Sequence, residues 1–559
     1  MLIPAGIDLG TRNARLAIIS KAQSTACIVP NPLGQRYTLA LSIEEPKAEA
    51  DPLNDQYWDK PKKANTKEEE TVEPAHYIYG EAARRTLHRL KKSLQPHFVL
   101  NLIKDAASDE STKVEDEDGG KVDSDEVQMK LRAAEAFFCH LTTQAIHATG
   151  VSAHPSSLRF VVSVPPDQVD SHNDLLIQSI ENGTVKYIEE VGLESAPDIA
   201  KSPNLNKRDK KQLLQEIQGT DRVLAVITEP IAIAHAHGLF EKNSDVSSNW
   251  KNVLVLDWGA SSLTLTHLQH LGSTGIASIQ ETKSESKSCG LNILNILVGH
   301  AAEIFERNCR NMIPRGETLQ NKKAKAKLEV ACEDALRSFG YSPKAQVTID
   351  GLIDGIDCQV EIMLARFEML LTPMLRTAEG MIRDFVTSSG GVDFDGILCS
   401  GGIMRMKCVE SMINRMFDGK WRGKSVGDVA PEEAIALGCA SFANTLLTIK
   451  NEAKGGKSIE EDLILSPINI GLSLSEADTS PFTMIEKMTP LPALVTKTIS
   501  MKNESSSAID IMQLSNDENK VIGKIEGFDS SAPSMEVTME LSGDGQLSVM
   551  INGGCPCTI

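Results

Sequence analysis

A strand that ends in an aspartate and then turns through small residues occurs twice in this chain. The first copy covers residues 6–11 (GIDLGT) and the second covers residues 254–262 (LVLDWGASS). Gly10 lets backbone N–H groups approach phosphate oxygens, because no Cβ stands in the way. Two such turns that face each other would clamp a triphosphate, and Asp8 and Asp257 would hold Mg²⁺ through its water ligands. Either turn alone is weak evidence, because Asp-x-Gly after a strand is often only a tight turn.

Short apolar runs alternate with helical patterns as far as Leu446. The apolar runs predict strands at residues 5–9, 16–19, 158–164, 223–227, 253–257 and 396–399. Apolar residues at helical spacing predict helices at residues 126–149, 291–308, 328–339 and 367–387. This alternation favours an α/β fold.

The pattern changes after Leu446. A polar stretch at 450–458 precedes a segment in which Ile470, Leu472 and Leu474 alternate with polar or small residues. A period of two predicts strands, and residues 537–541 are expected to pair with 546–549 across the glycine-rich turn at 543–545. We therefore expect a linker followed by an all-β unit, with no helical pattern after it.

Composition restricts the class of protein. The 559 residues allow roughly two to four folding units. The net charge of -19 argues against specific DNA binding, which needs a basic face. Eleven cysteines without a C-x2-C pair fit neither a disulfide framework nor a zinc site. The sequence shows no signal peptide, no prenylation signal and no apolar run near the roughly 20 residues of a membrane helix. We expect a cytoplasmic protein with reduced thiols and no membrane contact.

Two segments have the composition of insertions into the α/β part. Residues 44–74 are polar and contain prolines, and residues 105–126 hold ten carboxylates against two lysines. Such segments bury too little apolar surface to offset the entropy of ordering. We expect solvated loops, and a regulatory binding role for the acidic run is the alternative.

Five elements in a fixed order point to a superfamily. They are the two aspartate turns, a helix that opens at 228–230 (TEP), the strand end at 399–402 (CSGG), and residues 431–434 (PEEA) followed by Gly438. This order resembles that of the actin-like ATPases. Segments 229–239 (EPIAIAHAHGL), 365–368 (ARFE), 488–492 (MTPLP) and 521–524 (VIGK) resemble the heat shock protein 70 family of chaperones.

The resemblance covers nearly the whole chain outside the two insertions, and it implies a domain organisation. Residues 1–449 would form a two-lobed, actin-like (ribonuclease H-like) nucleotide-binding domain. Residues 450–462 would be a linker, and residues 463–559 a truncated β-sandwich like a peptide-binding domain, without a helical lid.

The resemblance also implies a site for ATP and Mg²⁺. Asp8 and Asp257 match the metal positions, and Glu229 and Asp257 match the catalytic carboxylates around the metal and the attacking water. The matched nucleotide-binding positions are Asp8, Gly10, Thr11, Arg12, Gly259, Ser262, Gly290, Glu333, Arg337, Gly401, Gly402, Arg405 and Glu432. A guanidinium can cover the face of adenine and a buried carboxylate can accept from ribose hydroxyls, so these residue types suit the task.

The departures from the family concern hydrolysis and coupling. The lysine that holds the attacking water falls at Asn101, although Lys104 lies one turn away and is a possible substitute. In the family, a proline and an arginine eight residues further on form the switch that couples the two domains. This chain keeps the proline as Pro165 but has Asn173 in the place of the arginine. The family arginine that receives a J-domain partner is replaced by Ala225. Loss of a positioned charge at a phosphoryl site typically lowers the rate by powers of ten. We expect ATP to bind and to be hydrolysed weakly or not at all.

These departures resemble the lidless, ribosome-associated Ssz-type subgroup of the family, which pairs with a J-protein of the zuotin type. The resemblance implies a co-chaperone that acts with a J-domain protein at the ribosome on nascent or unfolded polypeptide. One alternative is an active ATP-hydrolysing chaperone that works alone. A small-molecule kinase of the actin-like superfamily is the other.

Other conspicuous residues favour ordinary structural roles. The basic stretches at 84–92 and 322–327 are expected on solvated helix faces rather than on RNA. His235 and His237 point in different directions on a helix, so they predict packing and not a metal site. Cys555 and Cys557 lie at the C-terminal end, where an isolated C-x-C is usually inert.

Overall fold

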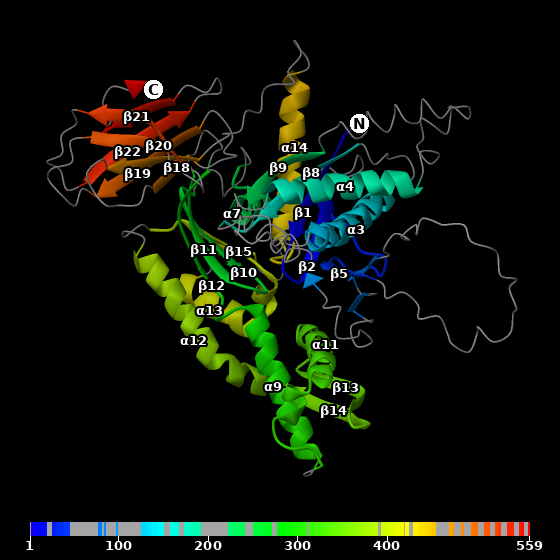
Figure 1. Ribbon diagram of the computed structural model, residues 1–559. Coiled ribbons are helices and arrows are strands. Elements are labelled where there is room, and N and C mark those ends of the chain that lie inside the picture. The colour runs from blue at the N-terminus through cyan, green and yellow to red at the C-terminus, as the bar shows by residue number, and fades with distance from the viewer. Residues whose placement is uncertain are drawn as a thin grey trace, which may run out of the picture.

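Figure 1 shows the computed structural model of the chain. It describes residues 2–19, 25–44, 77–80, 83–84, 97–98, 124–149, 157–166, 173–191, 222–240, 250–270, 277–309, 312–388, 393–418, 420–423, 429–453, 469–474, 482–485, 493–500, 508–514, 520–526, 534–541, 547–552 and 557–558.

The first sheet joins an antiparallel hairpin to parallel strands, in the order β3-β2-β1-β8-β9, with β4 paired to β2. Its strands are β1 (Ile3–Leu9), β2 (Asn13–Ile18), β3 (Cys27–Ile28), β4 (Thr38–Leu39), β8 (Leu158–Val164) and β9 (Val223–Thr228). β1 and β8 are almost wholly buried, which is why they read as continuous apolar runs. Helices α3 (Ser124–Thr149) and α4 (Asn173–Val191) pack together against this sheet in one apolar core (Figure 1).

The second sheet repeats this plan in the order β12-β11-β10-β15-β16. Its strands are β10 (Asn252–Trp258), β11 (Leu263–His270), β12 (Ala277–Glu285), β15 (Gly396–Ser400) and β16 (Trp421–Arg422). β10 pairs antiparallel with β11 and parallel with β15, as β1 pairs with β2 and β8. The two aspartates occupy equivalent places, since Asp8 is paired with Ser163 and Asp257 with Ser400.

Helices α7 (Glu229–Ala236) and α14 (Ala434–Ala453) cross where the two halves meet. A Cβ on Gly438 of α14 would lie 1.8 Å from the carbonyl oxygen of Ala232 in α7. A glycine is therefore required at this crossing, because real Cβ atoms do not approach a backbone oxygen so closely. The same helix α14 also packs on β1 and β8, which connects the crossing to the first aspartate turn.

A helical layer and an outer hairpin complete the second half. They comprise α9 (Gly290–Asn308), α10 (Glu317–Gln320), α11 (Lys322–Ser338), β13 (Lys344–Ile353), β14 (Ile356–Met363), α12 (Leu364–Ser388), the 3₁₀ turn η6 (Gly402–Arg405) and α13 (Lys407–Phe417). Figure 1 shows α11, β13 and β14 grouped beside the far end of α9. In the first half, β5 (Leu41–Glu44), β6 (Tyr77–Tyr79) and β7 (His97–Phe98) form a small separate sheet.

The C-terminal part is all β among its described residues. Its strands are β17 (Asn469–Leu474), β18 (Phe482–Ile485), β19 (Ala493–Ser500), β20 (Ala508–Leu514), β21 (Lys520–Glu526), β22 (Ser534–Leu541), β23 (Leu547–Ile551) and β24 (Cys557–Thr558). They form two four-stranded antiparallel sheets, β18-β17-β20-β21 and β19-β22-β23-β24, whose apolar side chains share one core. β22 pairs with β23 as the sequence predicted, with Leu541 opposite Leu547.

Most predicted elements are confirmed, with shifts at their ends. The predicted strands overlap β1, β2, β8, β9, β10 and β15, and the predicted helices overlap α3, α9, α11 and α12. Helix α11 begins at Lys322, six residues before the prediction, because the Asn321 side chain accepts hydrogen bonds from the N–H groups of Lys323 and Ala324. The sequence carried this N-cap, and the apolar periodicity missed it because the first turn is lysine-rich.

Three further expectations need correction or lie outside the described residues. Helix α14 continues to Ala453, into the stretch expected as linker, and α3 begins at Ser124, inside the second expected insertion. Residues 45–74 and 105–123 lie outside the described residues, as do 454–468. Among the residues that the structure describes, none of the helices combines the length and apolarity that crossing a membrane requires.

Candidate functional site

The candidate site lies where the parallel strands of both sheets end. β1, β8 and β9 run parallel in the first sheet, and β10 and β15 run parallel in the second. The carboxyl ends of parallel strands are where such sheets usually bind ligands. Residues predicted to bind nucleotide, or to act in hydrolysis and coupling, directly follow these strand ends. They are Gly10 to Arg12, Pro165, Glu229, Gly259 to Ser262, and Gly401 to Arg405.

The two aspartate turns face each other, as the sequence predicted. Thr11 Oγ1 donates to Ser261 Oγ at 2.9 Å across 250 residues of chain. Burial raises the pKa of Asp8 to about 7; the Arg15 guanidinium opposes this shift and the Asp257 carboxylate adds to it. Burial likewise raises the pKa of Asp257 to about 6. A buried and a partly buried carboxylate within electrostatic reach of each other favour a cation beside them, because a cation restores their charged forms.

Backbone hydrogen bonds hold the second turn in place. Gly259 N–H donates to the Ser262 carbonyl at 2.9 Å, so Ala260 and Ser261 form the tip of the turn. The N–H groups of Gly290 and Leu291, at the start of α9, donate to the carbonyls of Gly259 and Ala260 at 3.1 and 2.9 Å. The predicted nucleotide-binding residue Gly290 therefore supports the turn, with its N–H already bonded to protein.

A third turn follows β15, and it requires glycine. Gly401 has φ +95°, and a Cβ there would lie 2.1 Å from the Trp258 carbonyl oxygen. Its N–H donates to the Pro431 carbonyl at 2.9 Å, which ties this turn to the segment before α14. Gly402 has open space around its Cα, since an added Cβ would meet nothing within 4 Å. The Gly402 backbone is therefore open on its Cβ side, whereas Gly401 is packed against the Trp258 backbone.

Two arginines bind the consecutive carboxylates before α14. Arg405 donates to Glu432 through Nε and Nη2, with distances of 2.6–3.0 Å. Arg36 donates to Glu433 through Nε and Nη2 at 2.5 and 2.8 Å. The sequence predicted Arg405 and Glu432 in one adenosine pocket, and the structure brings these two side chains into contact. The sequence did not predict Arg36 there. No sequence signal links residues 36 and 433, because their pairing depends on how the two halves meet.

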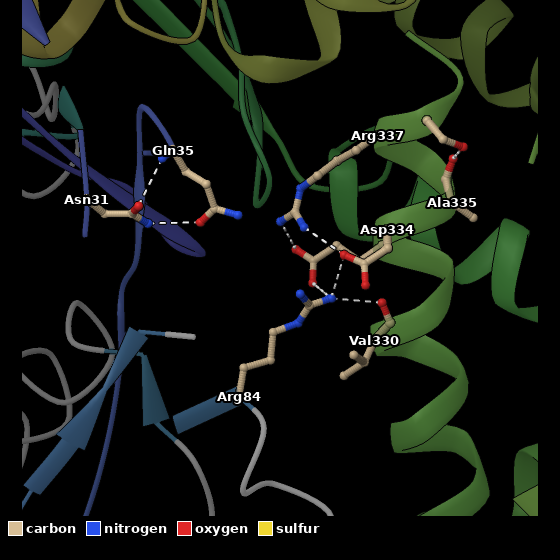
Figure 2. Close-up of polar contacts among 9 residues, drawn as sticks. Asn31, Gln35, Arg84, Val330, Asp334, Ala335 and Arg337 are labelled. Carbon is tan, nitrogen blue, oxygen red and sulfur yellow. Dashed lines mark hydrogen bonds and ion pairs between the residues drawn. The ribbon is translucent and has the colours of Figure 1, made fainter. Parts of the chain in front are cut away.

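Glu333 and Arg337 lie one turn apart on α11 and are bonded to each other, with Arg337 Nη2 3.2 Å from Glu333 Oε1. Figure 2 shows Arg84, from the other half of the molecule, reaching the same helix. Arg84 Nη2 donates to the Val330 carbonyl and to Asp334 Oδ1, both at 2.9 Å. The side chain of Arg84 is 8% exposed. The expectation of a solvated face is therefore wrong for Arg84, because α11 covers it and supplies a carboxylate.

Arg337 also contacts an aromatic ring of the first half of the molecule, that of Tyr37. The Arg337 guanidinium carbon lies 5.2 Å from the ring centroid of Tyr37, within the range of a cation–π interaction. Asn31 shapes the turn that carries Tyr37. Its side chain accepts from the Leu33 N–H and donates to the Tyr37 carbonyl. It also accepts from the Gln35 N–H, as Figure 2 shows. The residues expected around adenosine thus also join the two halves of the α/β part.

Glu229 opens α7 directly after β9, with Pro230 in the first turn, as predicted. Its carboxylate and that of Asp8 both raise the pKa of the buried Cys439 thiol, after the larger effect of burial. Glu229 and Asp8 therefore lie around the same part of α14. His235, further along α7, packs against the rings of Phe240 and Phe442 at 4.2 and 4.8 Å, which confirms its structural role.

The residues at the strand ends fit a hard cation and a polyphosphate. Asn13 and Thr228 each carry a buried side-chain oxygen that has no hydrogen-bond partner within the described part of the chain. With the carboxylates of Asp8 and Asp257 they offer oxygen donors of the kind that Mg²⁺ prefers. No group of three or more His, Cys, Asp or Glu side chains able to hold a metal occurs within the described ranges. The carboxylates of Asp8 and Asp257 suit Mg²⁺, which usually keeps several of its water ligands.

The positions expected to weaken hydrolysis and coupling are described only in part. Asn101 and Lys104 lie outside the described residues. Asn173 is the first residue of α4, and Pro165 follows β8. Ala225 is 3% exposed within β9. A buried alanine presents no cation to a partner at that point.

Arg15 is a second charged side chain at the site that the sequence did not predict. Arg15 Nη1 lies 3.6 Å from Asp8 Oδ2. The two residues are direct partners in the β1–β2 hairpin. The sequence predicted strands at residues 5–9 and 16–19, which leave Arg15 in the connection between them. The observed strand β2 begins at Asn13 and so places Arg15 opposite Asp8.

Comparison with known proteins identifies the family. The model of the family described as "Hsp70 protein" matches residues 212–552. A "Heat shock 70 kDa protein" of Ajellomyces capsulatus is 27% identical over 342 residues, which cover 58% of this chain and 46% of that protein. "Heat shock cognate 70 kDa protein 3" of Dictyostelium discoideum is 28% identical over 343 residues, covering 58% and 51%.

A rice protein, "Heat shock 70 kDa protein BIP3" of Oryza sativa subsp. japonica, is 25% identical over 339 residues, covering 58% of this chain and 47% of its own length. The chain thus spans about half the length of the curated relatives that it matches. The mixed α/β architecture is consistent with the actin-like ATPase fold of that family. Because the family model matches more than half of its residues, the chain belongs to the Hsp70 family.

Proposed function

We propose that this chain is an Hsp70-family co-chaperone that binds ATP with Mg²⁺ and hydrolyses it slowly or not at all. Its partners would be a J-domain protein and the ribosome, and its clients nascent or unfolded polypeptides. The observation that carries the nucleotide part is the pair of facing turns, joined by Thr11 and Ser261, with Asp8 and Asp257 within electrostatic reach of each other.

In this proposal each part of the site has a separate task. Asp8 and Asp257 hold the metal, and the turns that carry Gly10, Thr11, Arg12, Gly259 and Ser262 hold the phosphates. Bound Mg²⁺ would supply charge neutralisation for the phosphates. Glu333, Arg337, Gly401, Gly402, Arg405 and Glu432 bind adenosine; the pairing of Arg405 with Glu432 supports this because it fixes the guanidinium plane.

Slow hydrolysis is proposed from the missing charges. Asn101 replaces a cation at the attacking water, and Asn173 and Ala225 replace cations that the family uses for coupling and for J-domain contact. The burial of Ala225 supports the last point. Glu229 and Asp257 retain their carboxylates and would orient water without the missing charge beside them.

The domain boundaries along the chain are part of the proposed function. Residues 1–449 would form the nucleotide-binding domain and 463–559 the peptide-binding-like domain. Residues 450–462 would be the linker between them, and helix α14 extends into its first residues, as far as Ala453. The shared core of the two C-terminal sheets supports an independent folding unit there.

Three measurements on the full chain test the proposal. Calorimetry measures ATP affinity, single-turnover hydrolysis measures chemistry, and sedimentation of lysate with ribosomes, followed by pull-down, measures association. ATP binding with negligible turnover and co-migration with ribosomes and a J-domain protein is the expected result. Robust turnover by unassociated protein would instead support an active chaperone, and phosphorylation of a small molecule would support a kinase. An Asp257→Asn variant, which keeps the size of the side chain, should lose Mg²⁺-dependent ATP affinity.

A further inference from the structure

Arg15 lies inside the phosphate site, beside a carboxylate that the metal is expected to share. Asp8 and Arg15 are directly opposite in the β1–β2 hairpin, so their side chains leave the same face of the sheet. Arg15 Nη1 lies 3.6 Å from Asp8 Oδ2, with the two side chains 14% and 7% exposed. A permanent positive charge is therefore built into the first aspartate turn.

This ion pair leaves donor capacity on Arg15 unused. The 3.6 Å separation between Arg15 Nη1 and Asp8 Oδ2 is long for a hydrogen bond, and the contact is an ion pair. The Nε of Arg15 is buried and has no hydrogen-bond partner among the described residues. A guanidinium has five N–H donors in a planar fork that matches phosphate oxygens. A largely buried arginine with an unpaired Nε is suited to an anion that enters the site.

The other paired arginines around the crevice differ from Arg15. Arg36 and Arg405 are bonded to Glu433 and Glu432. Arg337 is bonded to Glu333 and Asp334. Each of these guanidiniums donates to carboxylates, so their charge is compensated inside the protein. Arg15 is also close enough to Glu432 to help lower the pKa of that carboxyl, which places its charge between the first turn and the segment before α14.

We propose that Arg15 is a phosphate-binding residue whose fixed charge lets a nucleoside triphosphate bind with reduced dependence on Mg²⁺. The inference rests on the proposed ATP site and adds a residue to it. Without Arg15, the Asp8 carboxylate would repel a polyphosphate unless a metal ion lay between them. With Arg15, part of that repulsion is already offset, and the guanidinium donates directly to phosphate oxygens.

Isothermal titration calorimetry on the full chain, with ATP in Mg²⁺ and in EDTA, tests the inference. Wild-type protein should lose less than about tenfold in affinity when Mg²⁺ is removed. Arg15→Gln should weaken binding in EDTA by about 10- to 100-fold relative to wild type, because a charge-assisted contact is lost. The same variant should lose less in Mg²⁺, where the ion supplies charge. Arg15→Lys keeps the charge without the fork and should lie between the two.

Arg383→Gln is the matched control, since it removes one arginine charge from the exposed face of α12. It should behave as wild type in both buffers. Thermal unfolding without nucleotide establishes that each variant is folded. Should Arg15→Gln not fold, the wild-type ratio decides: a loss of affinity of more than about tenfold on removal of Mg²⁺ overturns the inference.

Equal affinities of Arg15→Gln and wild type in EDTA overturn it as well. Absence of ATP binding in both buffers would instead overturn the proposed nucleotide site itself. The two failures are therefore distinguishable.

Discussion

Replacement of Gly438 by alanine should separate the helices on which the site is built. The added Cβ would lie 1.8 Å from the Ala232 carbonyl oxygen and 3.1 Å from its Cα. Both contacts are with backbone, so no change of rotamer relieves them, and α7 and α14 must move apart by about an ångström. Overpacking of this kind costs about 3 kcal/mol, and the better helix propensity of alanine offsets about 1 kcal/mol. We expect a net loss of about 2 kcal/mol.

The matched control is Gly299→Ala in α9. A Cβ there meets nothing within 4 Å, so alanine should stabilise the protein by up to about 1 kcal/mol. Urea unfolding followed by far-UV circular dichroism compares the two variants at their first transition. Because α7 begins at Glu229 and α14 packs on β1, Gly438→Ala should also weaken ATP binding. If Gly438→Ala proved as stable as Gly299→Ala, the close approach of the two helices would be refuted.

Three further predictions concern charged and titratable side chains. Arg36→Ala should lower the free energy of unfolding by about 1–2 kcal/mol, because the buried Glu433 loses its bidentate partner. In a double-mutant cycle, Glu433→Gln should remove most of this loss. Simple additivity of the two substitutions would contradict the pairing. Burial lowers the pKa of His235 to about 3. Below about pH 6.5 the unfolded chain therefore binds a proton that the folded chain does not bind. The free energy of unfolding should fall as pH drops below about 6.5, and it should fall less steeply in His235→Phe. An equal pH dependence of the free energy of unfolding in wild type and His235→Phe, measured by urea unfolding, would contradict this role of His235. Arg84→Met should speed hydrogen exchange in α11 but not in α12, and unchanged exchange in α11 would count against the bridge.

Local sequence patterns determined the element types and the two aspartate turns. The apolar runs of β1, β8 and β10 are continuous because both faces of these strands are covered, and that pattern is visible in the chain itself. The period of two after residue 468 likewise predicted the pairing of β22 with β23. Such features depend on neighbours a few residues away, and a sequence displays those directly.

Tertiary structure decided which charges meet. Arg84 was expected in water, yet it lies under α11 with Asp334, 250 residues further along the chain. Arg36 meets Glu433, and the side chains of Thr11 and Ser261 join the two turns. Each pairing requires both halves to fold and to meet at one relative position, which no local propensity encodes.

Arg15 lies between these two cases. Its residue type and its place after the first turn are in the sequence, but its contact with Asp8 depends on the hairpin register, which a shift of one residue would abolish by turning Arg15 to the other face. The sequence by itself determined that an aspartate turn occurs twice, and it predicted that both turns bind phosphate. Only the tertiary structure decided that the first turn carries its own cation, because side-chain contact follows from register and packing and not from order along the chain.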